Sequence, residues 1–295
     1  MNREIAENTV KDFNYFVDSK MEERITSGQQ ISDTLVDIQD FVKSIEPEWA
    51  EKHKDILPEI EQAENEEFFD LCAYAMIHNS GAMPSFIEQG LKARGEASEA
   101  FLIQYLELPI LEMDVNSQSL TKEQLYQTDM INSAIYLAGE LDSAAMYAKL
   151  AELFKQCITA NEMFLEKMVT ALSHKKALPV VKELLADQEL PDIKLADAMQ
   201  MICNIGEKDD EIFKLMKQGF KKLAKNPQTE IVAAMLMYDY GDARIIPAMR
   251  KLAKDKIEVA GIVTKDNTPV YILLSMINKL GGNTSELTGG RDLFN

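Results

Sequence analysis

Apolar residues recur at helical spacing along most of the chain, whereas the alternation typical of strands is almost absent. This pattern predicts a first helix from about Arg3 to Thr26 and a second from about Ile31 to Ile45. The second carries a narrow apolar stripe at alternating spacings of four and three, which is typical of a helical hairpin or a coiled-coil seam. Pro47 is expected to end it, because the residue before a proline is pushed out of the α region.

From Pro58 to about Leu280 the chain reads as helices separated by short breaks. Capping boxes predict helix starts after Thr121 and Thr159, and Asn226 before Pro227 predicts another. Residues 257–264 have some strand character and are read as an extended linker or a distorted helical turn. The principal breaks are expected at residues 79–81, 94–95, 116–119, 138–140, 173–174, 187–191, 206, 226–227, 241–242 and 267–269.

The chain repeats itself. Residues 177–187 align without gaps on residues 245–255, an offset of 68, or two units of 34. A second marker, a glycine after an apolar or aromatic step, follows the paired helix at Gly139, Gly206, Gly241 and Gly281. The intervals between these glycines are 67, 35 and 40 residues. Periods of this size predict an array of stacked helix pairs.

These segments resemble HEAT repeats, whose first helix carries a proline near its start and whose turn carries an aspartate. Pro179 with Asp187, and Pro247 with Asp255, match those two positions, and Pro84 matches the proline. The middle unit lacks the proline, and a basic residue early in the second helix is missing. The resemblance covers residues 66–280 and implies five or six helix pairs in a right-handed α-solenoid, with a concave face lined by the second helices.

Burial explains why such a sequence would stack, since one helix pair exposes too much apolar surface to stand alone. Each large side chain buried between neighbours contributes about 1.5–3 kcal/mol. The residues expected in this core are Leu195, Ala198, Met199 and Ile202 in one helix, and Ile231, Val232, Met235 and Leu236 in another.

The predicted fold is therefore all-α, with three parts. Residues 1–50 form an acidic helical hairpin, residues 51–280 form the HEAT-like array, and residues 281–295 form a loosely ordered tail. Trp49, the only tryptophan, is expected to anchor the hairpin to the array rather than to stack on a ligand.

The net charge of the chain indicates which classes of partner it can bind. The chain carries a net charge of −18, and residues 1–70 hold 19 acidic against 7 basic side chains. Such a balance disfavours nucleic-acid binding. One basic run is expected to be the solvated face of a helix: Lys214, Lys217, Lys221, Lys222 and Lys225.

The remaining composition predicts a cytoplasmic protein that does not bind membranes. No apolar run reaches the roughly 20 residues needed to cross a bilayer, and the charged start predicts no secretory signal. Cys72, Cys157 and Cys203 lie far apart, which favours reduced, buried thiols over a disulfide or metal framework.

Motifs for catalysis are absent from the sequence: it contains no phosphate-binding glycine loop, no zinc-protease motif and no nucleophile elbow. The three histidines, His53, His78 and His174, have no partner at metal-ligand spacing, and the last two are expected to cap helix ends. We therefore expect no enzyme activity, no cofactor and no metal.

The favoured function is binding of a protein or peptide, basic rather than acidic, on the concave face. Helix phase places ten side chains on that face: Asp197, Gln200, Met201, Asn204, Glu230, Met237, Tyr238, Tyr271, Ser275 and Asn278.

Two alternatives stay open. In one, the acidic hairpin neutralises a basic partner, as an inhibitor or immunity-type protein would. In the other, the array carries an enzyme site in a polar pocket. A DNA-repair glycosylase on a HEAT-like fold is disfavoured, because it would need a basic concave face. The sequence does not define the oligomeric state.

Overall fold

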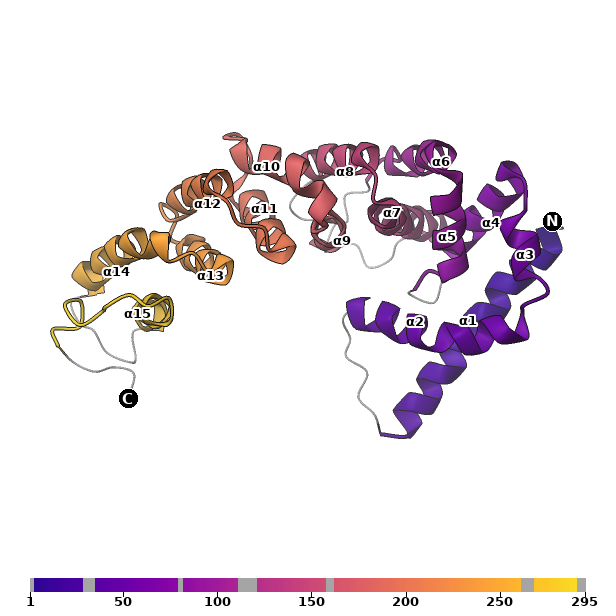
Figure 1. Ribbon diagram of the computed structural model, residues 1–295, viewed down its shortest axis with the longest axis horizontal. Helices are drawn as coiled ribbons and strands as arrows, with labels where there is room; N and C mark the ends of the chain where they lie inside the picture. Colours follow the sequence, from indigo (N-terminus) through magenta and orange to yellow (C-terminus); the bar gives the residue numbers. More distant parts are fainter. Residues whose placement is uncertain are drawn as a thin grey trace. The chain divides into compact units, whose positions relative to one another are not determined.

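The computed structural model describes residues 3–28, 35–78, 82–110, 121–157, 162–260 and 268–290. Within these ranges the chain forms fifteen α-helices and two short 3-10 helices, and no strand (Figure 1). The all-α prediction is confirmed. The helices form two compact units, Met1–Ala171 and Leu172–Asn295, and each is described by itself. The hairpin boundary predicted at residue 50 lies inside the first unit.

The first unit begins with two long helices, α1 (Arg3–Thr26) and α2 (Leu35–Lys52), that pack together. Trp49 is 1% exposed and contacts Phe13 edge-on, with ring centroids 5.1 Å apart. It also stacks on Phe86 of α5 at 5.6 Å. Trp49 therefore joins the two helices to α5, within a core cluster that contains Phe13, Val17, Phe41, Val42 and Ala82.

The prediction that Pro47 ends the second helix is wrong, because α2 continues to Lys52. A proline inside a helix costs about 3 kcal/mol, since it removes one backbone hydrogen bond and crowds the preceding turn. Contacts on both sides of Pro47 offset this cost. Glu46 binds the start of α5, and Trp49 is buried in the core only if the helix continues.

The rest of the first unit is built around α7 (Lys122–Leu141), which packs against α4, α5, α6 and α8. The capping box predicted at Thr121 is confirmed. The other helices are α3 (Leu57–Glu61), α4 (Asn65–Ile77), α5 (Ser85–Arg94), α6 (Glu96–Leu106), α8 (Ala144–Gln156) and α9 (Glu162–Leu172).

The predicted break at Gly139 is also wrong, because α7 runs on to Leu141. A Cβ atom at Gly139 would lie 2.9 Å from the Cβ atom of Ala171, so this glycine permits close packing with α9 and marks no turn. Gly90 of α5 has the same role, since a Cβ atom there would lie 2.2 Å from the ring of Phe68. Arg94 covers the same ring at 3.8 Å from its centroid.

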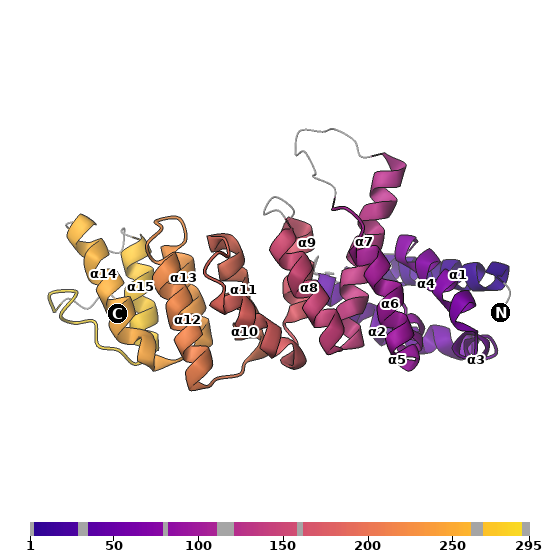
Figure 2. The same ribbon diagram turned by 90° about the horizontal axis from the view of Figure 1, so that it is seen from above.

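The second unit is a regular arrangement of helix pairs. The helices α11 (Asp192–Ile205), α13 (Glu230–Tyr240) and α15 (Thr268–Lys279) pack side by side in one row. Figures 1 and 2 show α10 (Leu178–Ala186), α12 (Asp210–Leu223) and α14 (Ile246–Ala260) in a second row along them. This arrangement gives the unit a helical-repeat-like fold.

The repeat predicted at an offset of 68 has a direct structural counterpart. A 3-10 turn, Lys175–Ala177, opens α10, and another, Ala243–Ile245, opens α14. Each α-helix then carries its proline at the second position, Pro179 or Pro247. Three glycine markers end helices with a positive φ: Gly206 at 74°, Gly241 at 70° and Gly281 at 88°. A side chain is strained in that conformation, whereas glycine is not.

Contacts between successive helix pairs recur at nearly constant sequence separation. Asn226 Nδ2 donates to Asp192 Oδ2 at 3.1 Å, across 34 residues, and the Arg244 guanidinium contacts Asp210 at 2.6 Å, again across 34. Cys203 Sγ donates to the carbonyl of Leu236 at 3.3 Å, across 33 residues. These contacts differ in chemistry but share a sequence separation of 33 or 34 residues, as expected for successive helix pairs of a repeat.

Three local predictions need correction or lie outside the described residues. Asn226 does not cap α13, which begins at Glu230; its Oδ1 instead accepts from the backbone N–H of Gln228, forming a turn. The strand-like segment is helical as far as Ala260, where the described residues stop until Thr268. The capping box at Thr159 lies outside the described residues.

Candidate functional site

The ten side chains predicted to form a binding face lie on α11, α13 and α15, which are neighbours in one row of the second unit. On α11, Asn204 is exposed, and Asp197 and Gln200 are half-buried. Gln200 Nε2 donates to Asn204 Oδ1 at 2.8 Å, and Asn204 Nδ2 donates to Ser173 Oγ at 3.1 Å. The end of α11 therefore presents an ordered amide chain to solvent.

On α13 and α15, four of the predicted residues are at least partly accessible. Tyr238, Tyr271 and Ser275 are half-buried, and Asn278 is exposed. The ammonium group of Lys279 lies 5.9 Å from the ring centroid of Tyr238, a cation–π contact that links α15 to α13.

The expectation that Met201, Met237 and Glu230 point outward is wrong. Both methionines are 0% exposed, and Glu230 is 7% exposed. Glu230 forms an ion pair with Lys256 of α14, so its carboxylate is directed to a neighbouring helix of the same unit. These three residues belong to the interior of the repeat and cannot contact a partner directly.

The phase of α13 differs from the sequence prediction, and the difference exposes two apolar side chains. Val232 and Met235, predicted to be core, are 42% and 49% exposed. The buried face is instead formed by Ala233, Ala234, Leu236, Met237 and Tyr240. Because α13 is apolar almost all around, its periodicity could not identify the buried face. Its small alanines, which permit close approach of neighbouring helices, were the available signal.

We call the accessible side of this row of helices the α13 face. Val232 and Met235 lie at its centre, one turn apart on the middle helix. Tyr238, Asp239 and Lys279 provide aromatic and charged groups nearby, and the amides at the end of α11 lie on the adjacent helix. Exposed apolar side chains with a polar margin are the arrangement found at protein-binding surfaces.

The two units differ sharply in charge. Residues 1–171 contain 13 Lys and Arg against 32 Asp and Glu, a net charge of −19. Residues 172–295 contain 18 against 17, a net charge of +1. The acidic surplus that led us to expect a basic partner is therefore confined to the first unit, whereas the α13 face belongs to a nearly neutral one.

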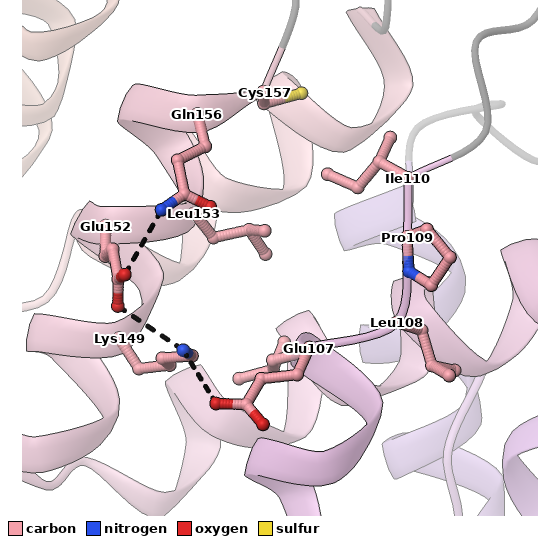
Figure 3. A pocket seen from close by; sticks show the side chains of 10 residues that line it. Glu107, Leu108, Pro109, Ile110, Lys149, Glu152, Leu153, Gln156 and Cys157 are labelled. Atoms are coloured by element: carbon pink, nitrogen blue, oxygen red, sulfur yellow. Dashed lines mark hydrogen bonds and ion pairs between the residues drawn. The ribbon is translucent and has the colours of Figure 1, made fainter.

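A pocket of about 350 Å³ lies in the first unit between α8 and the segment that follows α6 (Figure 3). Leu106, Leu153 and Cys157 contribute buried apolar wall. Figure 3 shows the Lys149 ammonium between two carboxylates, 3.1 Å from Glu107 and 3.3 Å from Glu152. Hydrogen bonding to Glu107 raises the pKa of Lys149, so this amine stays protonated and is a poor nucleophile.

Buried carboxylates form a second polar cluster in the first unit. Glu46 accepts from the Ser85 N–H at 2.9 Å and the Ser85 hydroxyl at 2.5 Å, so α2 supplies the missing cap of α5. Glu88 accepts from the Tyr136 hydroxyl at 2.5 Å and from Gln39 Nε2 at 3.2 Å. Burial raises the pKa of both carboxyl groups. Their partners are internal, which is typical of a structural network.

The cysteines and histidines have structural surroundings. Burial raises the pKa of Cys203 to about 12 and that of Cys72 well above its usual value, so both stay as thiols. His53 stacks on Trp49 with ring centroids 4.1 Å apart. His78 is the C-terminal cap residue of α4, and His174 precedes the first 3-10 helix, so both lie at helix ends as expected.

Within the described residues, no group of three or more His, Cys, Asp or Glu side chains is arranged to hold a metal ion. None of the described helices combines the length and apolar character needed to cross a membrane. Comparisons with models of known protein families, with curated proteins and with solved structures find no match to this chain.

Proposed function

We propose that this chain is a HEAT-like α-solenoid that binds a protein segment on the α13 face. The exposure of Val232 and Met235 on the middle helix of the row is the observation that carries this proposal. About half of each side chain is already covered, so burying the rest against a partner contributes about 1 kcal/mol each to the centre of a small interface. In a solenoid, the same row of second helices would line the concave surface.

The partner segment should carry apolar side chains for the centre of the face and basic groups for its margin. Asp239 is exposed and Asp197 is half-buried on the two adjacent helices, whereas Lys279 lies over Tyr238. The contribution of charge is therefore modest at this surface, and apolar contact would supply most of the affinity.

The experiment is selection of binders from a random peptide library on the full-length protein. The variant V232D/M235D places charge at the centre of the α13 face. The matched control is V259D, because Val259 of α14 is an 89% exposed valine outside this face. We expect the wild type and V259D to enrich the same apolar peptides with basic flanks, and V232D/M235D to lose them. Equal enrichment by all three proteins would contradict the proposal, provided that circular dichroism shows intact folds.

A second candidate function is neutralisation of a basic partner by the acidic first unit, as in inhibitor and immunity-type proteins. The net charge of −19 over residues 1–171 supports it. Charge of this size would steer a basic protein at rates that fall steeply with salt. If the partner binds the α13 face, its affinity should change little between about 0.1 and 0.5 M salt. If it binds the acidic unit, its association rate should fall strongly over the same range. Over this range the screening length shortens from about 10 to about 4 Å.

A further inference from the structure

The solvent-facing side of α12 is a stripe of lysines. Lys214, Lys217 and Lys221 recur on α12 at spacings of three and four, so they share one side of the helix, and Lys225 follows in the turn after its last residue, Leu223. The opposite side is fixed by Gly219, where a Cβ atom would lie 2.8 Å from Met199 Sδ of α11. Close packing on that side directs the stripe outward, and Lys214, Lys221 and Lys225 are exposed.

Within the described residues these four ammonium groups make no ion pair, unlike several other cations of the second unit. Lys182 pairs with Glu211, Lys256 with Glu230, and Arg250 with Glu286. Lys222, on the flank of the stripe, donates to the carbonyls of Gln188 and Leu190 at 2.8 Å. The stripe therefore concentrates positive charge that this unit does not neutralise, although the unit as a whole is nearly neutral.

A surface of opposite sign exists on the same chain. The first unit carries a net charge of −19, and its densest acidic segment runs from the short helix α3 into α4. Six exposed carboxylates lie in twelve residues of that segment: Glu59, Glu61, Glu64, Glu66, Glu67 and Asp70. Within the described residues, Glu59, Glu64 and Glu66 make no ion pair, whereas Arg94 acts electrostatically on Glu61 and Arg3 on Asp70.

We propose that copies of this protein associate head to tail, with the lysine stripe on α12 of one copy against the acidic α3–α4 segment of the next. Two different surfaces meet, so the contact is heterologous and each bound copy leaves one stripe and one acidic segment open. A second copy is favoured as the occupant, because each copy carries an acidic segment of opposite sign to the stripe. A copy can therefore orient its acidic unit toward the stripe.

Sedimentation velocity on the full-length protein tests this proposal. Association through exposed charges is weak and screened by salt, so we use protein concentrations of about 5 to 200 µM at ionic strengths of about 0.05 and 0.5 M. We expect the weight-average sedimentation coefficient of the wild type to rise with concentration at low salt and to stay constant at high salt.

Two charge-reversal variants locate the surfaces. K214E/K221E/K225E removes the stripe, and E59K/E61K/E64K/E66K removes the acidic segment; each should sediment as a monomer at every concentration. An equimolar mixture of the two should associate again, because the intact stripe meets the intact acidic segment and the two reversed surfaces are also of opposite sign. The matched control K11E/K54E/K122E changes the net charge as much as the stripe variant does, but at three exposed lysines of the first unit, and should associate like the wild type.

Several results would overturn the proposal. One is a wild type that stays monomeric up to the highest concentration at low salt. Others are wild-type association that high salt does not weaken, a stripe variant that associates as the wild type does, or a mixture that forms no complex. A monomeric wild type whose stripe bound a DNA duplex or a glutamate polymer would show instead that the surface takes a foreign polyanion.

Discussion

The two units of this protein are stabilised in different ways. In the second, contacts recur between successive helix pairs at separations near 34 residues, as in Asn226 with Asp192 and Arg244 with Asp210. In the first, single contacts without a counterpart join several helices, such as Arg94 over Phe68. Where similar contacts recur, each contributes only part of the stability between helix pairs, whereas the contribution of a unique contact is lost entirely when it is removed. Single substitutions should therefore have larger effects in the first unit.

The largest difference is expected between two glycine substitutions. In G90A, the new methyl group would lie 2.2 Å from the Phe68 ring. This ring cannot move away easily, because the Arg94 guanidinium packs over it. We expect a loss of about 3 kcal/mol in the free energy of unfolding. In G219A, the nearest atom is the flexible end of Met199 at 2.8 Å, and alanine favours the helix by about 1 kcal/mol.

The change in G219A should therefore stay within about 1 kcal/mol of the wild type. Urea unfolding followed by circular dichroism measures both variants, and limited proteolysis identifies the unit that opens first. Equal losses of unfolding free energy in G90A and G219A would show that the rigid Phe68 ring and the flexible Met199 side chain accommodate a methyl group equally well.

Two arginines give a smaller contrast. Arg94 donates to the carbonyls of Gly90 at 2.9 Å, Glu61 at 3.2 Å and Ala63 at 2.6 Å, and so ties the end of α3 to α5. R94A should cost about 2 kcal/mol, because three hydrogen bonds from a charged donor and the contact with the buried Phe68 ring are lost. Arg244 lies on the surface, where it pairs with the exposed Asp210 and with the half-buried Asp242.

R244A should shift the thermal midpoint by less than R94A does, and added salt should remove the shift. The comparison is made by calorimetry at low and high salt. A larger effect in R244A would show that the repeated surface pairs, rather than the unique buried contacts, dominate stability.

The smallest effect concerns the pH dependence of the first unit. Burial raises the pKa of Glu88 in the folded chain. Its contribution to stability is therefore fully present below the unfolded pKa of about 4.3 and is lost as pH rises through the folded pKa. In E88Q the side chain stays neutral and still accepts from Tyr136, so the decline in stability above about pH 4.5 should flatten.

Urea midpoints from pH 4.5 to 8 measure this slope, on a pH range set by the usual carboxyl pKa of about 4.3. E61Q is the matched control, since Glu61 is exposed. The explanation fails if E61Q flattens the slope as much as E88Q.

The sequence predicted the helical class, the offset of 68 and the glycine-ended helices, because these depend on local periodicity and on backbone conformations that few residues adopt. The helix end predicted at Pro47 and the break predicted at Gly139 were both wrong, because tertiary contacts determine the helix lengths there. Trp49 and Glu46 extend a helix that local rules would end, and Gly139 permits close packing where a turn was expected.

The candidate surface could be predicted only in part. The sequence predicted α11, α13 and α15 as helices, but Met201, Met237 and Glu230 are buried, and Val232 and Met235 are exposed. A helix that is apolar on every side has no periodicity to show which side faces its neighbours. The charge difference between the units also required the structure, because the boundary at residue 171 has no marker in composition.

The most direct test of the account is hydrogen exchange of the full-length protein with and without a peptide selected by the wild type. The account predicts slower exchange in α11, α13 and α15 on binding, no change in α1 to α4, and loss of the effect in V232D/M235D but not in V259D. Protection confined to the acidic helices of the first unit, with α13 unchanged, would contradict it and would support neutralisation of a basic partner instead.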